Sequence, residues 1–393
     1  MLESSSCPVC LSGTSVRIEH RDDVPVMMHK LYDSAEAARQ CRRGILDMRQ
    51  CQHCGFSWNA QFDASLVEYS ESYENDQTHS PVFAAHVDER AKDVVHAERN
   101  NDALDFLEVG CGQGGFLRLV AREAGVQLRS AEGFDPAFRG EGFHEGLCRI
   151  HKAYFSEQTV GFLHHTPNVV ASRHTIEHVP DPVSFLRAIR KSLGPKSNAV
   201  LFIETPCVDW ILNNRAMQDI FYEHCSIFTA TALDIALKRS GFDDVEIAHV
   251  FGGQYLWARA TATQPKSSDC SLMRASYASP VPQDAMKRCL TEWQSRLSAS
   301  AVEGKIALWG AGAKGITFAQ VVDPNGELID HVIDINPGKQ NHFLPGTGLK
   351  VLAPQAAVSR GPRSVFVMNP NYLAEIEHMA LLVGLSAQFI PVK

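Results

Sequence analysis

The chain has 393 residues, of which 45% are hydrophobic and 21% are charged, so it is long enough for two or three globular domains. Its formal net charge is -8, with no basic block that would follow a phosphate backbone, which argues against a nucleic-acid partner. No apolar run reaches the ~20 residues that span a membrane, and the first residues do not have the pattern of a secretion signal. We therefore expect a cytoplasmic protein with no membrane partner.

Two pairs of cysteines come first along the chain, Cys7 with Cys10 and Cys51 with Cys54. Each pair has the C-x-x-C spacing that presents two thiolates to one metal ion. The total of eleven cysteines is odd, so a disulfide framework is not expected. We predict a closed, structural Zn²⁺ site in a domain over residues 1–62, with a hairpin or loop between the pairs; four unconnected thiols are the alternative.

Residues 62–101 are polar and rich in tyrosine, which predicts a bridge into the next domain that includes a helix over 81–96. Clustered tyrosines commonly pack against a neighbouring element, but phenols at a domain junction also line substrate clefts. Tyr73 is the candidate for a site residue from this segment.

From 103 to 262, apolar runs alternate with amphipathic stretches, which predicts βα units and a mainly parallel sheet in a domain over residues 63–265. The expected strands are 105–109, 130–134, 169–172 and 200–204. The expected helices are 115–124, 182–193 and 230–240.

Residues 263–279 have the Ser, Thr, Pro and Lys content of a linker. A second, smaller α/β domain is expected over residues 280–393, beginning with a helix over 283–297. Its expected strands are 305–309, 328–335, 348–352 and 364–368.

A glycine-rich turn with Gly110, Gly112 and Gly114 follows the first strand of the larger α/β domain. Its glycines leave room for a nucleoside, and Glu108 precedes them where an amino group could be met. Asp135 ends the second strand, where a carboxylate can accept both ribose hydroxyls. Because a lone glycine turn is a weak indication, its surroundings must decide what it binds.

A third block, residues 171–182, follows a strand and opens a helix, and it contains Glu177 and His178. The three blocks together resemble class I methyltransferases that use S-adenosylmethionine, whereas a dinucleotide dehydrogenase would lack the third block. The resemblance implies a Rossmann-like core with His178 beside the methyl acceptor, although Glu177 and His178 could simply cap the next helix. The donor-binding residues that it implies, or that lie in these blocks, are Glu108, Gly110, Gly112, Gly114, Asp135, Ser172 and His174.

Glu223 and His224 come after the fourth strand, where the loops of such a sheet overhang the donor. A carbon beside a carbonyl becomes nucleophilic when a base removes its proton, and histidine titrates near neutral pH. The pair predicts proton removal by His224, with Glu223 orienting the ring or holding a substrate hydroxyl. On spacing alone the pair could also be a surface or capping feature.

The order of parts resembles the sugar C-methyltransferases that methylate nucleotide-linked ketodeoxysugars. The resemblance implies a small acceptor, enolised by a histidine and held partly by the C-terminal domain. Its catalytic candidates here are Tyr73, His178, Tyr222, Glu223 and His224. One departure is visible: the family commonly has Tyr-His-Glu-His in the turn, whereas this chain has Phe221-Tyr222-Glu223-His224. An O- or N-methyltransferase and a non-catalytic donor-binding protein are the alternatives.

A second glycine-rich turn, residues 310–315, follows the first strand of the C-terminal domain, and Lys314 within it could neutralise a diphosphate. The candidate acceptor-binding residues are Gly310, Gly312, Lys314 and Asn336. Asp334 stands at the spacing of a ribose-binding acid, so a nicotinamide cofactor is an alternative, although methyl transfer needs no redox cofactor. The second alternative is that the C-terminal domain is structural and binds no ligand.

Overall fold

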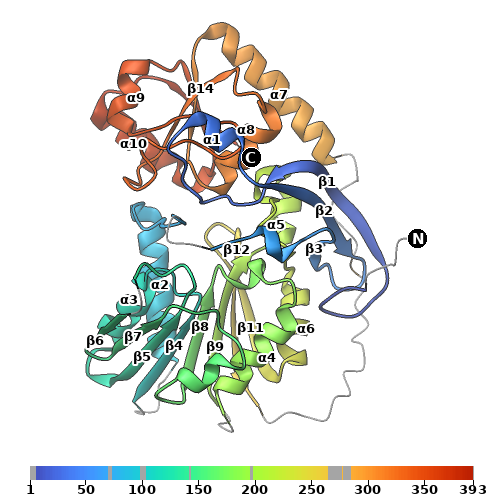
Figure 1. Ribbon diagram of the computed structural model, residues 1–393, viewed down its shortest axis with the longest axis vertical. Helices are drawn as coiled ribbons and strands as arrows, with labels where there is room; N and C mark the ends of the chain where they lie inside the picture. The colour runs from blue at the N-terminus through green and yellow to red at the C-terminus, as the bar shows by residue number, and fades with distance from the viewer. Residues whose placement is uncertain are drawn as a thin grey trace.

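The computed structural model describes residues 6–69, 73–97, 103–140, 143–194, 198–263, 277 and 285–392. Three sheets organise this part of the chain: a 4-stranded sheet, an 8-stranded central sheet and a 5-stranded C-terminal sheet. Figure 1 shows the C-terminal unit above the central one, with the N-terminal strands along one side. The expected α/β fold, a Rossmann-like core with two smaller units, is confirmed.

The N-terminal sheet is antiparallel and has the order β1-β2-β3-β10. The insertion between the cysteine pairs is a long hairpin of β1 (Ser15–Pro25) and β2 (Arg43–Cys51), with the short helix α1 (Ala35–Arg39) between them. β3 (Ser57–Asn59) pairs with β2 and with β10 (Ser226–Ile227). One strand of this sheet therefore comes from within the range predicted for the central domain.

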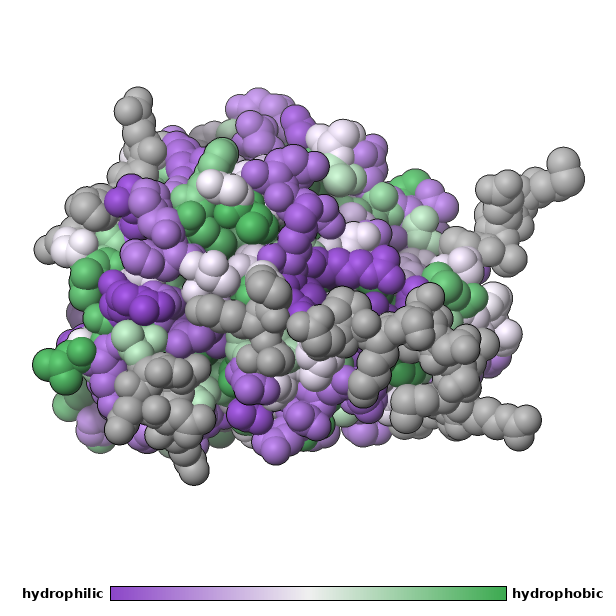
Figure 2. Space-filling view, turned by 90° about the horizontal axis from the view of Figure 1, so that it is seen from below, coloured by the Kyte–Doolittle hydropathy of each residue, from purple (hydrophilic) through white to green (hydrophobic). Residues whose placement is uncertain are grey.

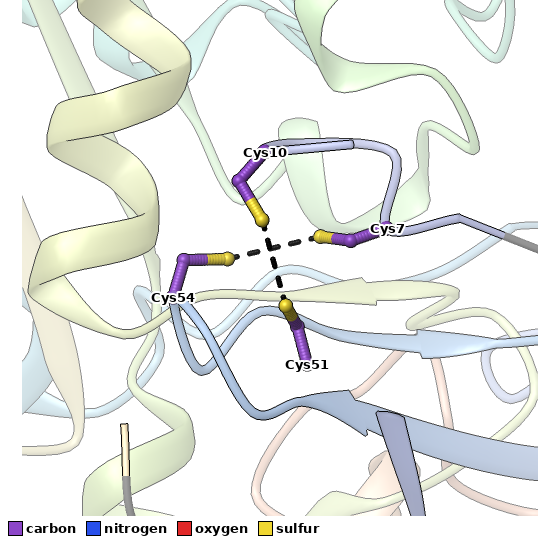
Figure 3. Close-up of side chains that lie close together, drawn as sticks. All are labelled: Cys7, Cys10, Cys51 and Cys54. Atoms are coloured by element: carbon purple, nitrogen blue, oxygen red, sulfur yellow. Dashed lines mark hydrogen bonds between the residues drawn. The ribbon is translucent and has the colours of Figure 1, made fainter. Parts of the chain in front are cut away.

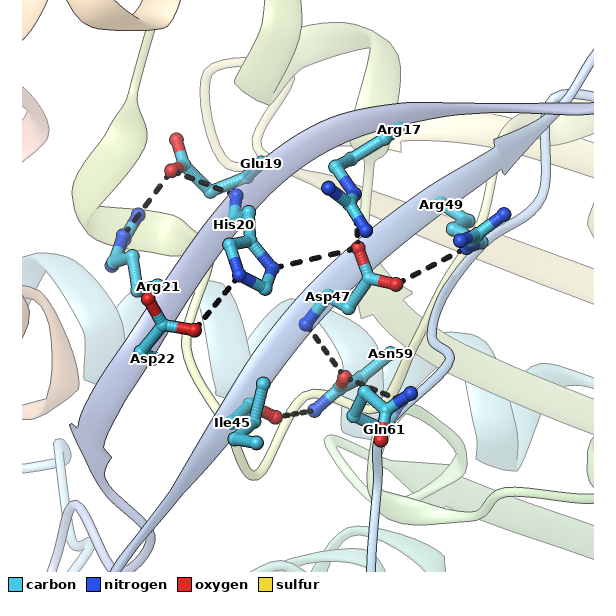
Figure 4. Close-up of polar contacts among 10 residues, drawn as sticks. All are labelled: Arg17, Glu19, His20, Arg21, Asp22, Ile45, Asp47, Arg49, Asn59 and Gln61. Atoms are coloured by element: carbon cyan, nitrogen blue, oxygen red, sulfur yellow. Dashed lines mark hydrogen bonds and ion pairs between the residues drawn. The ribbon is translucent and has the colours of Figure 1, made fainter. Parts of the chain in front are cut away.

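A buried carboxylate ties the N-terminal hairpin together (Figure 4). Asp47 on β2 is 2% exposed and forms ion pairs with Arg17 of β1 at 2.5 Å and with Arg49 at 3.2 Å. The Asn59 side chain accepts the Asp47 N–H at 2.9 Å and donates to the Ile45 carbonyl at 3.2 Å. Because a buried charge is tolerated only when it is paired, this network favours one register of β1 on β2.

The central sheet has the order β11-β12-β9-β8-β4-β5-β7-β6. Its five middle strands are parallel, and β6, β11 and β12 run antiparallel to their neighbours. The predicted strands appear as β4, β5, β8 and β9, whereas the other four were not predicted. The strands are β4 (Leu104–Val109), β5 (Leu128–Phe134), β6 (Phe143–Glu145), β7 (Cys148–His151), β8 (Val169–Arg173), β9 (Val200–Pro206), β11 (Phe242–Val250) and β12 (Tyr255–Ala262).

Helices cover both faces of the central sheet. Alternate residues of its strands point to opposite sides, and both sets are mainly apolar, so each face is buried against helices. Phe106 of β4 lies in the apolar cluster that contains residues of α2 and α3, and Leu107 lies in the cluster that contains residues of α4 and α6. The four helices predicted for this region begin at the predicted residues. The helices are α2 (Pro81–His96), α3 (Gly115–Ala124), α4 (Pro182–Ser192), α5 (Val208–Asn213) and α6 (Ala230–Arg239).

The C-terminal sheet is parallel throughout, in the order β15-β14-β13-β16-β17. Its strands are β13 (Ile306–Trp309), β14 (Ile329–Ile333), β15 (Val351–Leu352), β16 (Ser364–Val367) and β17 (Gln388–Pro391), of which β17 was not predicted. Its helices are α7 (Ala285–Glu303), α8 (Ala313–Val322), α9 (Pro354–Arg360) and α10 (Leu373–Val383). α7 continues beyond the predicted end at 297. The predicted linker lies outside the described residues except for Thr263 and Tyr277.

The N-terminal unit connects the other two. The Ala38 carbonyl of α1 accepts the Gly346 N–H at 2.8 Å, and the Arg39 side chain donates to the Thr347 carbonyl at 3.1 Å. One apolar cluster contains residues of the N-terminal segment 24–28, of the central segment 208–227 and of the C-terminal sheet. The three units therefore share a core.

The face of the molecule shown in Figure 2 is mostly hydrophilic, and its hydrophobic residues form small, separate groups. Among the described helices, none is both long enough and apolar enough to cross a membrane.

Candidate active site

The four cysteines of the two pairs converge, as Figure 3 shows. The Sγ atoms of Cys7 and Cys54 are 3.7 Å apart, those of Cys10 and Cys51 are 3.5 Å apart, and all four lie within 4.8 Å of one another. Sulfurs around one tetrahedral Zn²⁺ lie about 3.8 Å apart, whereas a disulfide requires about 2.05 Å. All four side chains are buried, so the geometry fits a closed metal site of the predicted composition.

The cysteine site is joined to the segment that carries Glu223 and His224. The Thr229 hydroxyl donates to the Cys54 carbonyl at 2.7 Å, and the Cys225 carbonyl accepts the Asn59 N–H at 3.0 Å. These contacts lie on either side of β10, so the metal site and the Glu-His turn are supported by the same strand.

A cavity of about 1530 Å³ lies where the central domain meets the C-terminal unit and the tyrosine-rich segment. Pockets for one drug-sized ligand have volumes of about 300–1,000 Å³, so this cavity has room for a donor and an acceptor together. The predicted site residues that line it are Tyr73, Glu108, Gly110, Gly112, Asp135, His174, His178 and Asn336. The predicted residues outside its lining are Gly114, Ser172, Tyr222, Glu223, His224, Gly310, Gly312 and Lys314.

The glycine turn after β4 is held by the carboxylate at the end of β5. Asp135 accepts the N–H of Gly112 at 2.7 Å and the N–H of Ala137 at 2.8 Å. Gly110 has φ +78°, and a Cβ there would lie 1.9 Å from the Thr175 hydroxyl oxygen. A side chain at Gly110 is therefore excluded by both backbone conformation and space.

Glu108 is a buried carboxylate at the edge of this crevice. It is 3% exposed, and its Oε2 has no hydrogen-bond partner among the described residues. Burial raises its pKa to about 8, although the nearby Arg173 opposes this effect. A buried carboxylate with a free oxygen is a suitable partner for the ammonium group of a bound ligand.

His174 and Ser172 differ in their exposure to the cavity. The His174 ring lies 3.5 Å from Glu177 and 3.6 Å from Glu204 through its two nitrogens, and it packs edge-on against Tyr255. Ser172 is fully buried on β8, and its hydroxyl has no hydrogen-bond partner among the described residues. Only His174 of these two can reach a ligand in the cavity.

The two histidines near the cavity have unlike surroundings. His178 Nδ1 lies 2.9 Å from the Tyr69 hydroxyl. Burial lowers the pKa of His178, and the neighbouring Glu177 carboxylate and Glu223 backbone oppose this effect. His224 lies 5.0 Å from His178 between ring centres and 3.9 Å from Phe221, and its Nδ1 has no partner among the described residues. Burial, reinforced by His178, lowers the pKa of His224 well below 6.5. His224 is therefore neutral near pH 7.

Glu223 is completely buried, and its carboxylate accepts the Met28 N–H at 2.5 Å. Its other described neighbour is the Tyr73 phenol, and burial raises the pKa of Glu223 to about 7. Both contacts run to the N-terminal half of the chain rather than to the His224 ring. Tyr222 also faces that way, because its hydroxyl accepts the Asp63 N–H at 2.8 Å.

Sequence reasoning did not select two residues that border this site, Tyr69 and His29. Tyr69 belongs to the tyrosine-rich segment, but only its hydrogen bond to His178 distinguishes it. The His29 ring centre lies 5.2 Å from that of Tyr73, and burial, with a smaller effect of Lys339, lowers its pKa to about 3. A single histidine on a long hairpin gives no local signal of this position.

Glu177, His178 and His224 each place one ligand atom within 4.8 Å of the others. The same group therefore has the composition of a metal site as well as that of an acid-base site.

The glycine turn after β13 is held in the same way as the first. Asp334 accepts the N–H of Ala311 at 2.7 Å and the N–H of Asn336 at 2.8 Å. The Lys314 ammonium, however, donates to Asp219 at 2.8 Å, on the central domain. The predicted contact between Lys314 and a diphosphate would have to replace this ion pair.

Two family models match the chain: one described as a methyltransferase domain, over residues 83–247, and one described as a C-methyltransferase C-terminal domain, over residues 282–391. The C-methyltransferase NovU of Streptomyces niveus is 24% identical over 288 residues, which cover 69% of this chain and 67% of NovU.

Solved structures give weaker matches. The CurJ carbon methyltransferase is 15% identical with a TM-score of 0.36, over 47% of this chain and 56% of that one. The CMeT domain of the citrinin polyketide synthase is 15% identical with a TM-score of 0.35, over 47% of this chain and 54% of that one.

Proposed function

We propose a general base for this chain from the premise that it is an S-adenosylmethionine-dependent C-methyltransferase, which joins a methyltransferase domain to a C-methyltransferase C-terminal domain. The proposed base is His224. The observation that carries this proposal is the contrast between the two histidines. His178 Nδ1 is paired with the Tyr69 hydroxyl, whereas His224 is buried and neutral, and its Nδ1 has no partner among the described residues.

S-adenosylmethionine supplies a methyl group on a positively charged sulfur. Glu108 would bind the amino group of this donor, and Asp135 would accept its ribose hydroxyls. Both side chains line the cavity at the ends of adjacent parallel strands, β4 and β5. The donor methyl would then face the part of the cavity bordered by His178 and Tyr69.

His224 Nδ1 would take the proton from an acceptor carbon beside a carbonyl as the new carbon–carbon bond forms. The Tyr69–His178 hydrogen bond would hold the His178 ring beside the acceptor, where this ring would position the carbonyl oxygen. Burial of these groups favours a neutral imidazole and excludes water that would otherwise protonate the carbanion.

We propose that the acceptor is a small ketone, and that a nucleotide-linked keto sugar is the best candidate. The cavity supports this choice because it extends from the donor crevice to Asn336 of the C-terminal unit and has room for two ligands. Phe221 favours the second candidate, methylation of an oxygen or nitrogen on another metabolite. Phe221 lies against His224, with the two rings tilted by 40°, where the sugar family commonly has a tyrosine, so the hydroxyl of that tyrosine is missing.

We also propose that Cys7, Cys10, Cys51 and Cys54 hold one structural Zn²⁺. The four sulfurs would fill a tetrahedral shell and leave no position for water, so this ion would stabilise the N-terminal unit and take no part in methyl transfer.

His224→Ala tests the assignment of the base. With labelled donor and a panel of nucleotide-linked keto sugars, we expect kcat to fall by about 10²–10⁴-fold, because general-base catalysis typically contributes that factor. Exchange of the acceptor α-proton with deuterated solvent should be lost as well, while binding of S-adenosylhomocysteine stays near wild type.

His178→Ala is the matched control for this experiment. It should retain measurable proton exchange, because the free nitrogen of His224 is still present. Near wild-type turnover in His224→Ala would contradict the proposal, and a label that NMR locates on oxygen or nitrogen would favour the second candidate.

A further inference from the structure

A second group of metal-ligating side chains lies at an edge of the central sheet, apart from the cysteine site and from the cavity histidines. Glu132 is on β5, His151 is on β7, and His164 is in the loop before β8, and each places one ligand atom within 4.8 Å of the others. We propose that these three side chains bind a divalent transition-metal ion, with Zn²⁺ as the best match to two imidazoles and one carboxylate.

The separations of the ligand atoms are close to those of a tetrahedral site. Glu132 Oε2 lies 2.9 Å from His151 Nε2 and 3.2 Å from His164 Nδ1. Ligand atoms 2.0–2.1 Å from a tetrahedral ion lie about 3.3 Å from one another. The three atoms need only a small outward movement to accept the ion.

The carboxylate is held in place by its other oxygen. Glu132 Oε1 accepts the backbone N–H of His164 at 2.8 Å and that of His165 at 3.4 Å, which leaves Oε2 directed at the two rings. Glu132 is 4% exposed, and its Oε2 lies within hydrogen-bonding distance of both imidazoles. Outer contacts of this kind orient metal ligands.

His151 is oriented by stacking. Its ring lies 4.4 Å from that of Phe134, at an interplanar angle of 22°, and its carbonyl accepts the Asp135 N–H at 3.1 Å. Phe134 and Asp135 line the donor side of the cavity. A bound ion would therefore stiffen the strand end that presents Asp135.

The site also has an access route. The His164 side chain is 50% exposed, and His151 is 17% exposed, so an ion can enter from solvent and keep a water ligand in the fourth position. This openness distinguishes the cluster from the closed cysteine site. Without a metal, Glu132 Oε2 would form hydrogen bonds with the two imidazoles. The metal-bound and metal-free forms can therefore be distinguished by counting the ions bound per chain.

The test counts metal ions in the full-length protein. After dialysis against Zn²⁺ and removal of the excess, we expect two zinc ions per wild-type chain and one per chain of His164→Ala. His165→Ala is the matched control and should keep two, because its side chain is adjacent and exposed. Glu132→Gln should also lose one ion while retaining an acceptor for the two N–H groups that hold the loop.

Cobalt identifies which site each ion occupies. Thiolate ligands give intense charge-transfer absorption, so the ion lost in His164→Ala should contribute only weak d–d bands. One zinc per wild-type chain at saturation would overturn the proposal. Retention of both ions in His164→Ala, or thiolate absorption from the second cobalt ion, would overturn it equally.

Discussion

At the end of β5, Asp135 accepts two backbone N–H groups at 2.7 and 2.8 Å, one from the glycine turn after β4 and one from two residues further along its own chain segment. At the end of β14, Asp334 accepts two N–H groups at the same distances, one from the glycine turn after β13 and one from two residues further along its own segment. The two crevices are thus built alike around their strands. They differ in what lies over them.

The first crevice opens into the cavity, and Glu108 there keeps a free carboxylate oxygen. Over the second, Lys314 is bonded to Asp219 and to Gln254, at 2.8 and 3.2 Å. His29 reaches the second turn from the N-terminal hairpin, because a Cβ on Gly312 would lie 3.8 Å from its ring.

A glycine turn with a strand-terminal acid therefore specifies a strand–helix connection, whereas the neighbouring units decide whether that connection binds a ligand. We therefore expect the first crevice to bind the donor and the second to form a contact between domains. The variants below test this difference between the two crevices.

Asp135→Ala compared with Asp334→Ala should give the largest difference. Loss of the two proposed ribose contacts, each worth about 1.5–3 kcal/mol, should weaken S-adenosylhomocysteine binding by roughly a hundredfold or more in Asp135→Ala. Asp334→Ala loosens an equivalent turn and is therefore the matched control, with donor affinity near wild type by calorimetry. Equal losses in the two variants would mean that the effect is one of folding.

The pH dependence of donor binding tests the role of Glu108. The pKa of about 8 means that this carboxyl is protonated below pH 8 in the free protein, whereas the donor ammonium favours the ionised form. Affinity for S-adenosylhomocysteine should therefore rise about fiftyfold from pH 6 to pH 8 and then level off. Calorimetry should also show proton release, and Glu108→Gln should bind weakly without this pH dependence. A flat profile in the wild type would remove Glu108 from the amino-group site.

Lys314→Ala should act on stability rather than on the donor. Lys314 and Asp219 have side-chain exposures of 19% and 14%, and a hydrogen bond between charged groups contributes about 1.5–3 kcal/mol. We expect a lower Tm by several degrees in thermal unfolding, with donor affinity unchanged. Lys314→Ala and Asp219→Ala should not be additive in the double variant. A raised acceptor KM without a lower Tm would instead show that Lys314 binds the acceptor, as the sequence predicted.

The smallest expected effect concerns NAD. Because the second crevice is covered by protein side chains, titration with NADH should give no saturable change in fluorescence. Saturable binding that Asp334→Asn abolishes would show that the second crevice opens, and the comparison would fail.

The sequence predicted the parts of the fold that depend on neighbouring residues. The parallel strands of the two α/β units, except β7 and β17, were predicted because apolar runs, glycine turns and strand-terminal acids such as Asp135 are adjacent along the chain. The four cysteines were found from their spacing, and the structure brings their sulfurs together. The predicted roles of the donor and acceptor residues stay predictions.

The parts that were missed depend on contacts between distant segments. β11 is the edge strand of the central sheet and has many partly exposed positions, and its neighbour β12 is interrupted by Arg259 and Thr261, so neither has the continuous apolar run of β4. The position of Tyr69 depends on where the bridge meets His178, and the partner of Lys314 depends on how two domains dock. No local pattern encodes either arrangement.

The pairing of β10 with β3 has a consequence for how the protein can be made and divided. Trp58 pairs with Ser226, so during synthesis the cysteine-bearing unit must wait for most of the central domain before its sheet is complete. Such a long sequence separation slows folding, and a fragment that ends after the second cysteine pair would lack its edge strand. Because β10 begins two residues after His224, an N-terminal unit exchanged between related enzymes would carry half of the support of the Glu-His turn with it. Chimeras should therefore exchange the N-terminal unit and this turn together.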